Sequence, residues 1–520
     1  MASPTTIVGN IPFFGRMFAV DQSTGLEDIN AWPALMIMTS FIWLAVAGLL
    51  GVVMPLVQFL DLGPLGPNLY YTALTGHGAA LAFPFVFQLM VGVGLHRMGS
   101  CRGQPITGPI PALIYIFMNV GSLLLTVAIL LGLKISLVVM YPLPVVGVQT
   151  GQWSMNVVIL GFTGIALVLI TMIILYPIQV IKMAFFGKAR QELLLSPRSL
   201  QDPGMLGMLM AAFVLLIAGI PLLIVASTIL GFLYGIVPGA LVGWAAKPVV
   251  FQFVFFIFAH NLMEAMALMV ISAVYATLPL YLADGTRKLY SEPLARIALW
   301  ILLLTSLTSF FHHFITLFPN LPAALAYHGN IMSFGTGIGS ALSIFTILAT
   351  IWKHGLRPAP GLMAILLGFV LYILDGASAV VTSNVAWSFQ LHGTMWQSGH
   401  TMTVLVSMAL MWMGVLYHHY PVMTGRQIDE QLGNLFVKLC AVGCVGAAVV
   451  MLAGGAAGMP RRFADWGQGG WMGYGTLILI FGLILGVAYV VYAVSLYRSR
   501  EIAGAEFNKL LVDGGWGTVR

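Results

Sequence analysis

Twelve apolar stretches, each long enough to cross a lipid bilayer as a helix, divide this sequence of 520 residues. About 20 helical residues span the hydrocarbon core of a membrane, and backbone polar groups in lipid must be bonded within the segment itself. The stretches cover roughly residues 33–59, 70–95, 110–140, 154–181, 205–236, 248–282, 293–317, 331–352, 361–386, 393–417, 434–458 and 471–497. The sequence therefore predicts an all-α polytopic membrane protein with twelve transmembrane helices, in which residues 1–520 form one domain.

Charged residues make up 7% of the chain and hydrophobic residues 60%, which excludes a water-soluble protein. If the N-terminus lies inside, all but four of the 22 Lys and Arg fall on inner segments. The four exceptions are Lys134, Lys247, Arg461 and Arg462. Because basic residues gather in cytoplasmic loops, both termini are expected to face the cytoplasm. This distribution accounts for the net charge of +6, so we expect membrane lipid around the protein and no nucleic-acid partner.

Five histidines within these stretches are predicted to share one layer in the outer half of the bilayer. They are His77, His260, His312, His313 and His400, which lie far apart in the sequence. A single histidine in an apolar helix is more often hydrogen-bonded to a neighbouring carbonyl than bound to a metal. Five at one depth favour a functional site, because polar side chains in the bilayer are costly.

Glu264 is the only charged residue between positions 248 and 283, and it follows His260 by four positions in AHNLMEAMA. Residues four apart share one helix face at about 6 Å, so both can bind one metal ion, as in zinc-binding helices. His312 and His313 point about 100° apart on a regular helix, and both reach the same ion only if the helix end is distorted. Three imidazoles with a carboxylate suit Fe(II) or another borderline divalent ion better than Cu(I). We therefore expect a cation to compensate the charge of Glu264.

His400 and Met402, in WQSGHTMTV, lie two positions apart and face nearly opposite sides of a helix. One helix can therefore ligate two separate haems. Methionine is a soft haem ligand that raises the reduction potential relative to paired histidines. Packing is the alternative for Met402, because the chain has 29 methionines and most must fill the core.

Five motifs together resemble the catalytic subunit of the haem-copper oxidase superfamily, in the right order and over all twelve stretches. They are LTGHGAALAF, AHNLME, FFHHFITLFP, LHGTMWQSGHTMTVL and GMPRRFADW. The likeness is greatest to the B-type oxygen reductases, particularly in HGTMWQSGH and in the charged inner loop before EPLARIALW. The resemblance implies the fold of subunit I of that superfamily.

The resemblance also implies two haems, expected to be of b type, and a second metal. It makes His77 an axial ligand of a low-spin haem and His400 the proximal ligand of a high-spin haem. His260, His312 and His313 would bind the second metal. Each of the five histidines in the layer then has a ligand role.

Two arginines in an outer loop receive a role in the same way. Arg461 and Arg462, with His392 nearby, would pair with the haem propionates, and a position against the positive-inside trend agrees with anion binding. A solvated loop is the alternative for this arginine pair. Met402 departs from the family, which has a histidine on the low-spin haem at this position. We expect His77 and Met402 to ligate that haem.

Glu264 is the second departure. B-type oxygen reductases have a tyrosine at this spacing, used when the O–O bond breaks, whereas nitric oxide reductases of the superfamily have a glutamate that binds a non-haem iron. The resemblance therefore implies a membrane nitric oxide reductase that catalyses 2 NO + 2 e⁻ + 2 H⁺ → N₂O + H₂O. The residues expected to be catalytic are Glu264, His260, His312, His313 and His400, the first four holding a non-haem iron.

Two other functions remain open from the sequence. The nearer one is a terminal oxygen reductase of B type with a haem-copper centre, and the other is a secondary transporter. The chain has no CxxCH motif and no Cys-rich copper motif, so electrons would arrive through a second subunit with a copper A or cytochrome c domain, or from quinol. Asp375 and Lys134 belong either to a proton route or to local pairs. The resemblance places the protein in a prokaryotic cytoplasmic membrane.

Overall fold

The protein is described by a computed structural model, whose described residues are 14–20, 27–60, 62–63, 65–102, 105–135, 153–185, 202–314, 322–467 and 469–502. Within these residues, twelve helices are long and apolar enough to cross a membrane, which confirms the all-α prediction. They are Glu27–Phe59, Leu65–Ser100, Pro109–Leu130, Met155–Phe185, Pro203–Leu233, Pro248–Tyr281, Glu292–His313, Ala323–His354, Pro360–Ser383, Met395–Thr424, Glu430–Ala456 and Met472–Tyr497. The termini at residues 1–13 and 503–520, including their predicted cytoplasmic side, lie outside the described residues.

Several of these spans are composites of two or three helical segments. The second joins α4 (Leu65–Ala80), the π-helix η2 (Leu81–Phe87) and α5 (Gln88–Arg102); the fourth joins α7 (Met155–Ile170), η3 (Thr171–Leu175) and α8 (Tyr176–Phe185). The sixth joins α12 (Pro248–Thr277) to η4 (Leu278–Tyr281), and the seventh joins α13 (Glu292–Ser309) to η5 (Phe310–His313). The single-helix spans are α3 (Glu27–Phe59), α6 (Pro109–Leu130), α10 (Pro203–Leu233), α15 (Ala323–His354), α16 (Pro360–Ser383), α18 (Met395–Thr424), α19 (Glu430–Ala456) and α20 (Met472–Tyr497). The short elements are α2 (Phe14–Phe18), α11 (Gly239–Val242), α17 (Val385–Leu391) and the antiparallel strands β1 (Arg426–Gln427) and β2 (Arg500–Glu501).

The predicted span boundaries differ most from the structure at two places. The third span ends at Leu130 rather than near residue 140, because Gly132, at φ 113°, turns the chain out of the helix. Residues 136–140 of that prediction lie outside the described residues. The eighth span begins at Ala323, eight positions before the predicted start, directly after Pro322. Proline ahead of a helix lacks only an N–H that the helix would leave unbonded.

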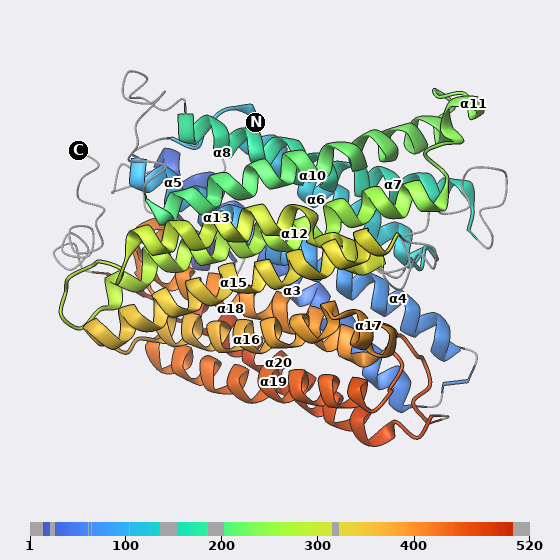
Figure 1. The fold of residues 1–520 in the computed structure, drawn as a ribbon. Helices are drawn as coiled ribbons and strands as arrows, with labels where there is room; N and C mark the ends of the chain where they lie inside the picture. The colour runs from blue at the N-terminus through green and yellow to red at the C-terminus, as the bar shows by residue number, and fades with distance from the viewer. Residues whose placement is uncertain are drawn as a thin grey trace.

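The helices run side by side, with α19 and α20 along one flank and α8 and α10 along the opposite flank (Figure 1). The tenth span, α18, is the most enclosed: 83% of its apolar window is buried, against 17% for α20 and 22% for α15. The second span follows with 78%. These two spans carry the histidines predicted to hold haems, so the candidate ligands lie on the innermost helices.

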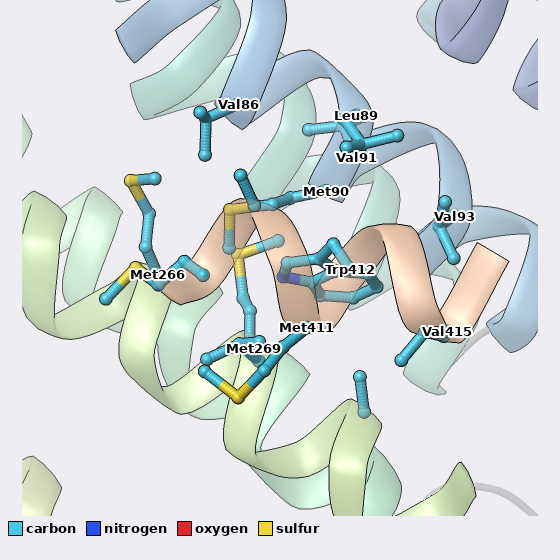
Figure 2. Close-up of a cluster of buried hydrophobic side chains, with 14 of the residues drawn as sticks. Val86, Leu89, Met90, Val91, Val93, Met266, Met269, Met411, Trp412 and Val415 are labelled. Atoms are coloured by element: carbon cyan, nitrogen blue, oxygen red, sulfur yellow. The ribbon is translucent and has the colours of Figure 1, made fainter. Parts of the chain in front are cut away.

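Methionines fill much of the space between α5, α12 and α18. Met90, Met266, Met269 and Met411 surround the fully buried Trp412 (Figure 2). Flexible thioether side chains suit the irregular gaps left where tilted helices cross. This apolar core lies on the side of the histidine layer where α12 and α18 end, because Met266 and Met411 follow His260 and His400 along their helices.

Candidate metal centre and haem ligands

His260, His312 and His313 come together from two helices into one cluster. One nitrogen from each ring lies within 4.8 Å of the others, a spacing that suits a shared metal ion. The ring centroid of His260 lies 4.9 Å from that of His312 and 5.3 Å from that of His313. The predicted ligand set of three imidazoles is therefore assembled by the fold.

The distortion predicted for adjacent histidines is present. Residues Phe310–His313 form the 3₁₀ turn η5 at the end of α13, and the rings of His312 and His313 lie 4.2 Å apart with 36° between their planes. Helix α15 packs tightly on this turn because position 329 is glycine. A Cβ added at Gly329 would come 2.5 Å from the His312 backbone nitrogen.

The hydrogen bonds around the cluster direct ring nitrogens toward its centre. Ser333 donates its hydroxyl to the Gly329 carbonyl at 2.7 Å, so its oxygen accepts from His312 Nδ1 at 2.8 Å. The lone pair of His312 is then on Nε2, the tautomer that metal ligation requires. His260 Nδ1 is buried and has no hydrogen-bond partner. A buried imidazole nitrogen without a partner fits a metal ligand, because an unsatisfied polar atom is otherwise costly.

Glu264 lies one turn beyond His260, at the middle of the 34-residue span Pro248–Tyr281. It is not a member of the three-histidine cluster. Asp375, His400 and Tyr372 lie within electrostatic reach of its carboxylate. Metal ligation by Glu264 therefore stays a prediction, and the structure adds a second acidic group to its surroundings.

His400 is oriented by helix α16. Its Nδ1 lies 2.7 Å from Asp375 Oδ1 and 3.3 Å from Ser378 Oγ, while Ser378 donates to the Asp375 carbonyl at 2.8 Å. A carboxylate on Nδ1 fixes the tautomer and leaves Nε2 to an iron, which is the usual outer support of a metal-bound histidine. The residues present thus fit a haem ligand at His400. Asp375 belongs to a local pair, one of the two alternatives left open above, and Lys134 is also locally paired, donating to Asn68.

His77 is held in a comparable way by α3. Its Nδ1 lies 2.8 Å from the Ala47 carbonyl, and a Cβ added at Gly51 would come 2.8 Å from that nitrogen. The ring therefore occupies a recess that only glycine leaves open, with Nε2 directed away from α3. This arrangement fits an axial haem ligand. Met402 is partly buried and packs at the edge of the main apolar core, and its ligation of the same haem stays a prediction.

Arg461 and Arg462 lie in the loop between α19 and α20, which is predicted to face outward. The Arg461 backbone N–H donates to the Gly393 carbonyl at 3.2 Å, and Arg462 adopts a left-handed φ of 58°. Arg462 has a buried guanidinium nitrogen without a hydrogen-bond partner. Burial lowers the pKa of each arginine to about 10, and it lowers the pKa of His392 to about 4, helped by the two guanidinium charges. An anion such as a haem propionate would satisfy this pair.

His392 connects the loop to the metal cluster, because its ring lies 6.2 Å from that of His313. The Tyr71 hydroxyl donates to the Arg462 carbonyl at 3.2 Å, which ties the loop to α4, the helix that carries His77. The structure therefore brings together the predicted propionate residues and both predicted haem helices. Both arginines are half-buried, and their pairing with haem propionates stays a prediction.

A row of hydroxyl groups on α15 was missed by the sequence analysis. We call it the hydroxyl ladder; it consists of Ser333, Thr336, Ser340, Ser343, Thr346 and Thr350. The first member, Ser333, bonds to His312 as described above. Two further members bond to hydroxyl groups on neighbouring helices: Thr336 to that of Thr305 and Ser340 to that of Tyr372, each at 3.2 Å between oxygens. The spacing of three or four residues, which places these side chains on one helix face, was the signal available in the sequence.

A second group of buried histidines was also missed. His96 Nδ1 lies 2.9 Å from His419 Nδ1, and His96 Nε2 lies 2.9 Å from Asn30 Oδ1. His418 packs against His419 with ring centroids 5.5 Å apart. His96 follows His77 by 19 residues, about 28 Å along a helix. This group therefore lies near the end of the bundle opposite to the histidine layer, beyond the methionine-rich core.

The fold and the site together define a twelve-helix membrane protein with a three-histidine metal cluster beside histidines suited to haem. The chain matches the family described as "Cytochrome C and Quinol oxidase polypeptide I" over residues 33–498. A heme-copper terminal oxidase dimer solved by cryo-electron microscopy has the same fold, with a TM-score of 0.74 and 18% identity over 94% of this chain and 90% of that one.

Curated relatives agree with this match. Cytochrome c oxidase subunit 1 of Thermostichus vulcanus is 23% identical over 440 residues, which cover 82% of this chain and 76% of the relative. The proteins of that name from Corynebacterium diphtheriae and Thermus thermophilus are 25% and 26% identical over 52% and 44% of this chain, and the matches span 46% and 42% of their lengths. The chain belongs to the cytochrome c and quinol oxidase polypeptide I family, that is, to subunit I of the haem-copper oxidase superfamily. It is an integral membrane oxidoreductase of electron transport, and the transporter alternative is set aside.

Proposed function

We propose that this chain is the catalytic subunit of a membrane-bound nitric oxide reductase, which converts two NO to N₂O and water. The observation that carries the proposal is Glu264, which stands one helical turn from His260 in the middle of the sixth span. A carboxylate at that depth is costly unless a cation compensates it, and three imidazoles with one oxygen ligand favour iron over Cu(I).

Each group of side chains has a defined part in this proposal. When bound, the haems and the second metal supply the electrons that reduce the gas. His260, His312 and His313 hold the second metal, and Glu264 adds an oxygen ligand to it. Asp375 holds His400 by its Nδ1 and leaves Nε2 free, so that His400 would ligate the high-spin haem. Low-spin haem ligation by His77 and Met402, and propionate pairing by Arg461, Arg462 and His392, complete the proposed set.

Oxygen reduction with copper as the second metal is the second candidate. The names of the relatives support it more directly than they support NO reduction, because the curated relatives compared above are cytochrome c oxidases and the structural relative is a terminal oxidase. Tyr372, which hydrogen-bonds Ser340 and lies near Glu264, also gives the centre a phenol.

Gas consumption by the purified protein separates the two candidates. With excess electron donor, the proposal expects NO to be consumed at least tenfold faster than O₂, with N₂O as the product. Metal analysis should give two haems and one non-haem iron, with no copper. Faster consumption of O₂ together with one copper atom per chain would instead establish the oxygen reductase.

Electron delivery and location follow from the same proposal. A second subunit with a copper A or cytochrome c domain, or membrane quinol, supplies the electrons. The hydroxyl ladder carries protons from the inner side, because it reaches from His312 toward the inner end of α15. The protein lies in a prokaryotic cytoplasmic membrane with both termini in the cytoplasm.

A further inference from the structure

The hydroxyl ladder ends next to a pair of titratable side chains, Asp284 and His354, which have no part in the proposed metal and haem sites. Helix α15 ends at His354, one turn after Thr350 and on the same helix face. His354 Nδ1 lies 2.6 Å from Asp284 Oδ2 and 3.3 Å from Thr286 Oγ1. Asp284 and Thr286 are in the loop between η4 and α13, outside the spans, so the pair lies where the ladder meets water.

The intervals along the ladder are short enough for single water molecules to bridge. At 1.5 Å of rise per residue, neighbouring hydroxyls three or four positions apart are about 4.5–6 Å apart along the helix axis. The step from Thr350 to His354 is of the same length. Tyr275, on α12, faces Ser343 and Thr346 and adds a phenol beside the middle of the row. A water molecule that bridges two polar groups makes hydrogen bonds nearly as favourable as a direct one, so bridging waters would join the ladder into one hydrogen-bonded chain along which protons pass.

The two side chains of the pair differ in their exposure to solvent. A group that collects protons must contact water, and the group that passes them inward must lie at the buried side. The Asp284 side chain is 39% exposed and the His354 side chain 9% exposed. The Thr286 backbone N–H, at 3.1 Å, lowers the pKa of Asp284, as do its hydroxyl and the neighbouring His354. The Asp284 carboxylate is therefore ionised at neutral pH, and the His354 imidazole lies within hydrogen-bond distance of it.

The basic residues around the pair do not neutralise it. Lys353 lies over the Tyr290 ring at 5.8 Å, and Arg357 donates to the Leu280 carbonyl at 3.0 Å. Arg287 and Lys288 follow Asp284 in the same exposed loop. Among the described residues, Asp284 and His354 are therefore the carboxylate–imidazole pair that lies at the inner end of the ladder.

We infer that Asp284 and His354 are the proton-collecting pair of this protein, which takes protons from the inner water phase and passes them to the hydroxyl ladder. The inference rests on the proposed function only in that the reaction consumes protons. Two NO reduced by two electrons take up two protons, and O₂ reduced by four electrons to two waters takes up four, so the pair is required with either gas. An electron placed in a low-dielectric centre also draws a compensating proton when no gas is present.

Proton uptake without substrate tests this inference separately from the proposed function. The haem-loaded protein under argon is reduced by a flash from a photoexcited ruthenium dye, and a pH-indicator dye in weakly buffered solution follows the protons. We expect Asp284→Asn and His354→Leu each to slow proton uptake at least tenfold. The rate of haem reduction and the haem absorption spectrum should stay as in the unchanged protein, because the substituted side chains lie at the opposite end of α15 from the metal cluster.

Matched variants distinguish a proton-transfer role from a structural one. Asp284→Glu keeps the acid and should restore fast uptake. Glu430→Gln removes an exposed acid at the start of α19, away from the ladder, and should leave uptake unchanged. Ser343→Ala interrupts the ladder and should slow uptake with the pair intact. Proton uptake at the unchanged rate in both Asp284→Asn and His354→Leu would overturn the inference, whichever gas the protein reduces.

Discussion

Glu264 is the residue on which the choice of gas depends. Its position at the middle of a span is fixed by the sequence, whereas its neighbours Asp375, His400 and Tyr372 come from helices more than a hundred residues away. Two acidic groups near one another in a membrane need a cation or a proton between them. In the proposed function, the metal ion bound by the three histidines would compensate this acidic charge.

Glu264→Gln should remove the negative charge that the second metal is expected to compensate. We expect the second metal to be lost, or NO turnover to fall at least a hundredfold, while both haems remain bound. Metal content by mass spectrometry, together with the haem absorption spectrum, measures the result. Glu264→Asp should retain part of the metal. Full metal occupancy and full NO turnover in Glu264→Gln would remove the main support for NO as substrate.

Asp375→Asn should act through His400 rather than through the second metal. Removing the charged partner of a metal-bound histidine typically costs about 10–100-fold in affinity or activity. The high-spin haem should therefore bind more weakly, seen as a lower haem-to-protein ratio. Ser378→Ala is the matched control, because its oxygen is 3.3 Å from His400 Nδ1 against 2.7 Å for the carboxylate, and it should change haem content little.

At the level of elements, the 3₁₀ turn η5 and the helix α15 act as one unit. The turn brings His312 and His313 to the same point, and α15 supplies the Ser333 hydroxyl that fixes the His312 tautomer. The close approach depends on Gly329, where no side chain stands between the two backbones. The ligand geometry is therefore set by helix packing as much as by the ligands.

Gly329→Ala tests that dependence. The new methyl group would lie 2.5 Å from the His312 backbone nitrogen, so η5 or α15 must shift. Overpacking of this kind costs about 1–3 kcal/mol of stability, and the second metal should be lost before the haems. Gly337→Ala on the same helix is the control, because its Cβ would make an ordinary 3.8 Å contact with Val380. It should keep the metal, as measured by metal content and thermal unfolding.

On the scale of the whole molecule, the bundle separates two polar regions by an apolar one. The histidine layer lies toward the N-terminal ends of α12 and α18, the group of His96 and His419 lies toward the C-terminal ends of α5 and α18, and the methionine-rich core lies between them. In the proposed function, protons for the metal centre pass along α15, at the side of the bundle, rather than through its middle.

The orientation of the bundle gives a prediction for the intact protein. Eighteen of 22 basic residues fall on segments assigned to the inner side, so a fluorescent reporter that folds only in the cytoplasm should fluoresce when fused to the C-terminus. A periplasmic enzyme reporter fused after Arg462 should be active instead. The opposite pattern would invert the topology and place the Asp284–His354 pair outside.

Local sequence determined the parts of this protein that depend on neighbouring residues along the chain. Hydropathy over about 20 residues sets the spans, because each helix bonds its own backbone in lipid. The residue types of the metal cluster were also predictable, since an acid and several histidines in lipid are costly without a function. The third span was predicted too long because hydropathy alone does not register the turn at Gly132.

Only the tertiary structure decided which of these residues meet. Three contacts join residues of different helices. They are the cluster of His260 with His312 and His313, the pair of His400 with Asp375, and the bond between the hydroxyl ladder and His312. Such contacts depend on the rotation and crossing of helices, which side-chain packing sets and hydropathy does not. The physical reason is range: a helix forms from contacts four residues apart, whereas a binding site forms from contacts between helices that the sequence keeps far apart.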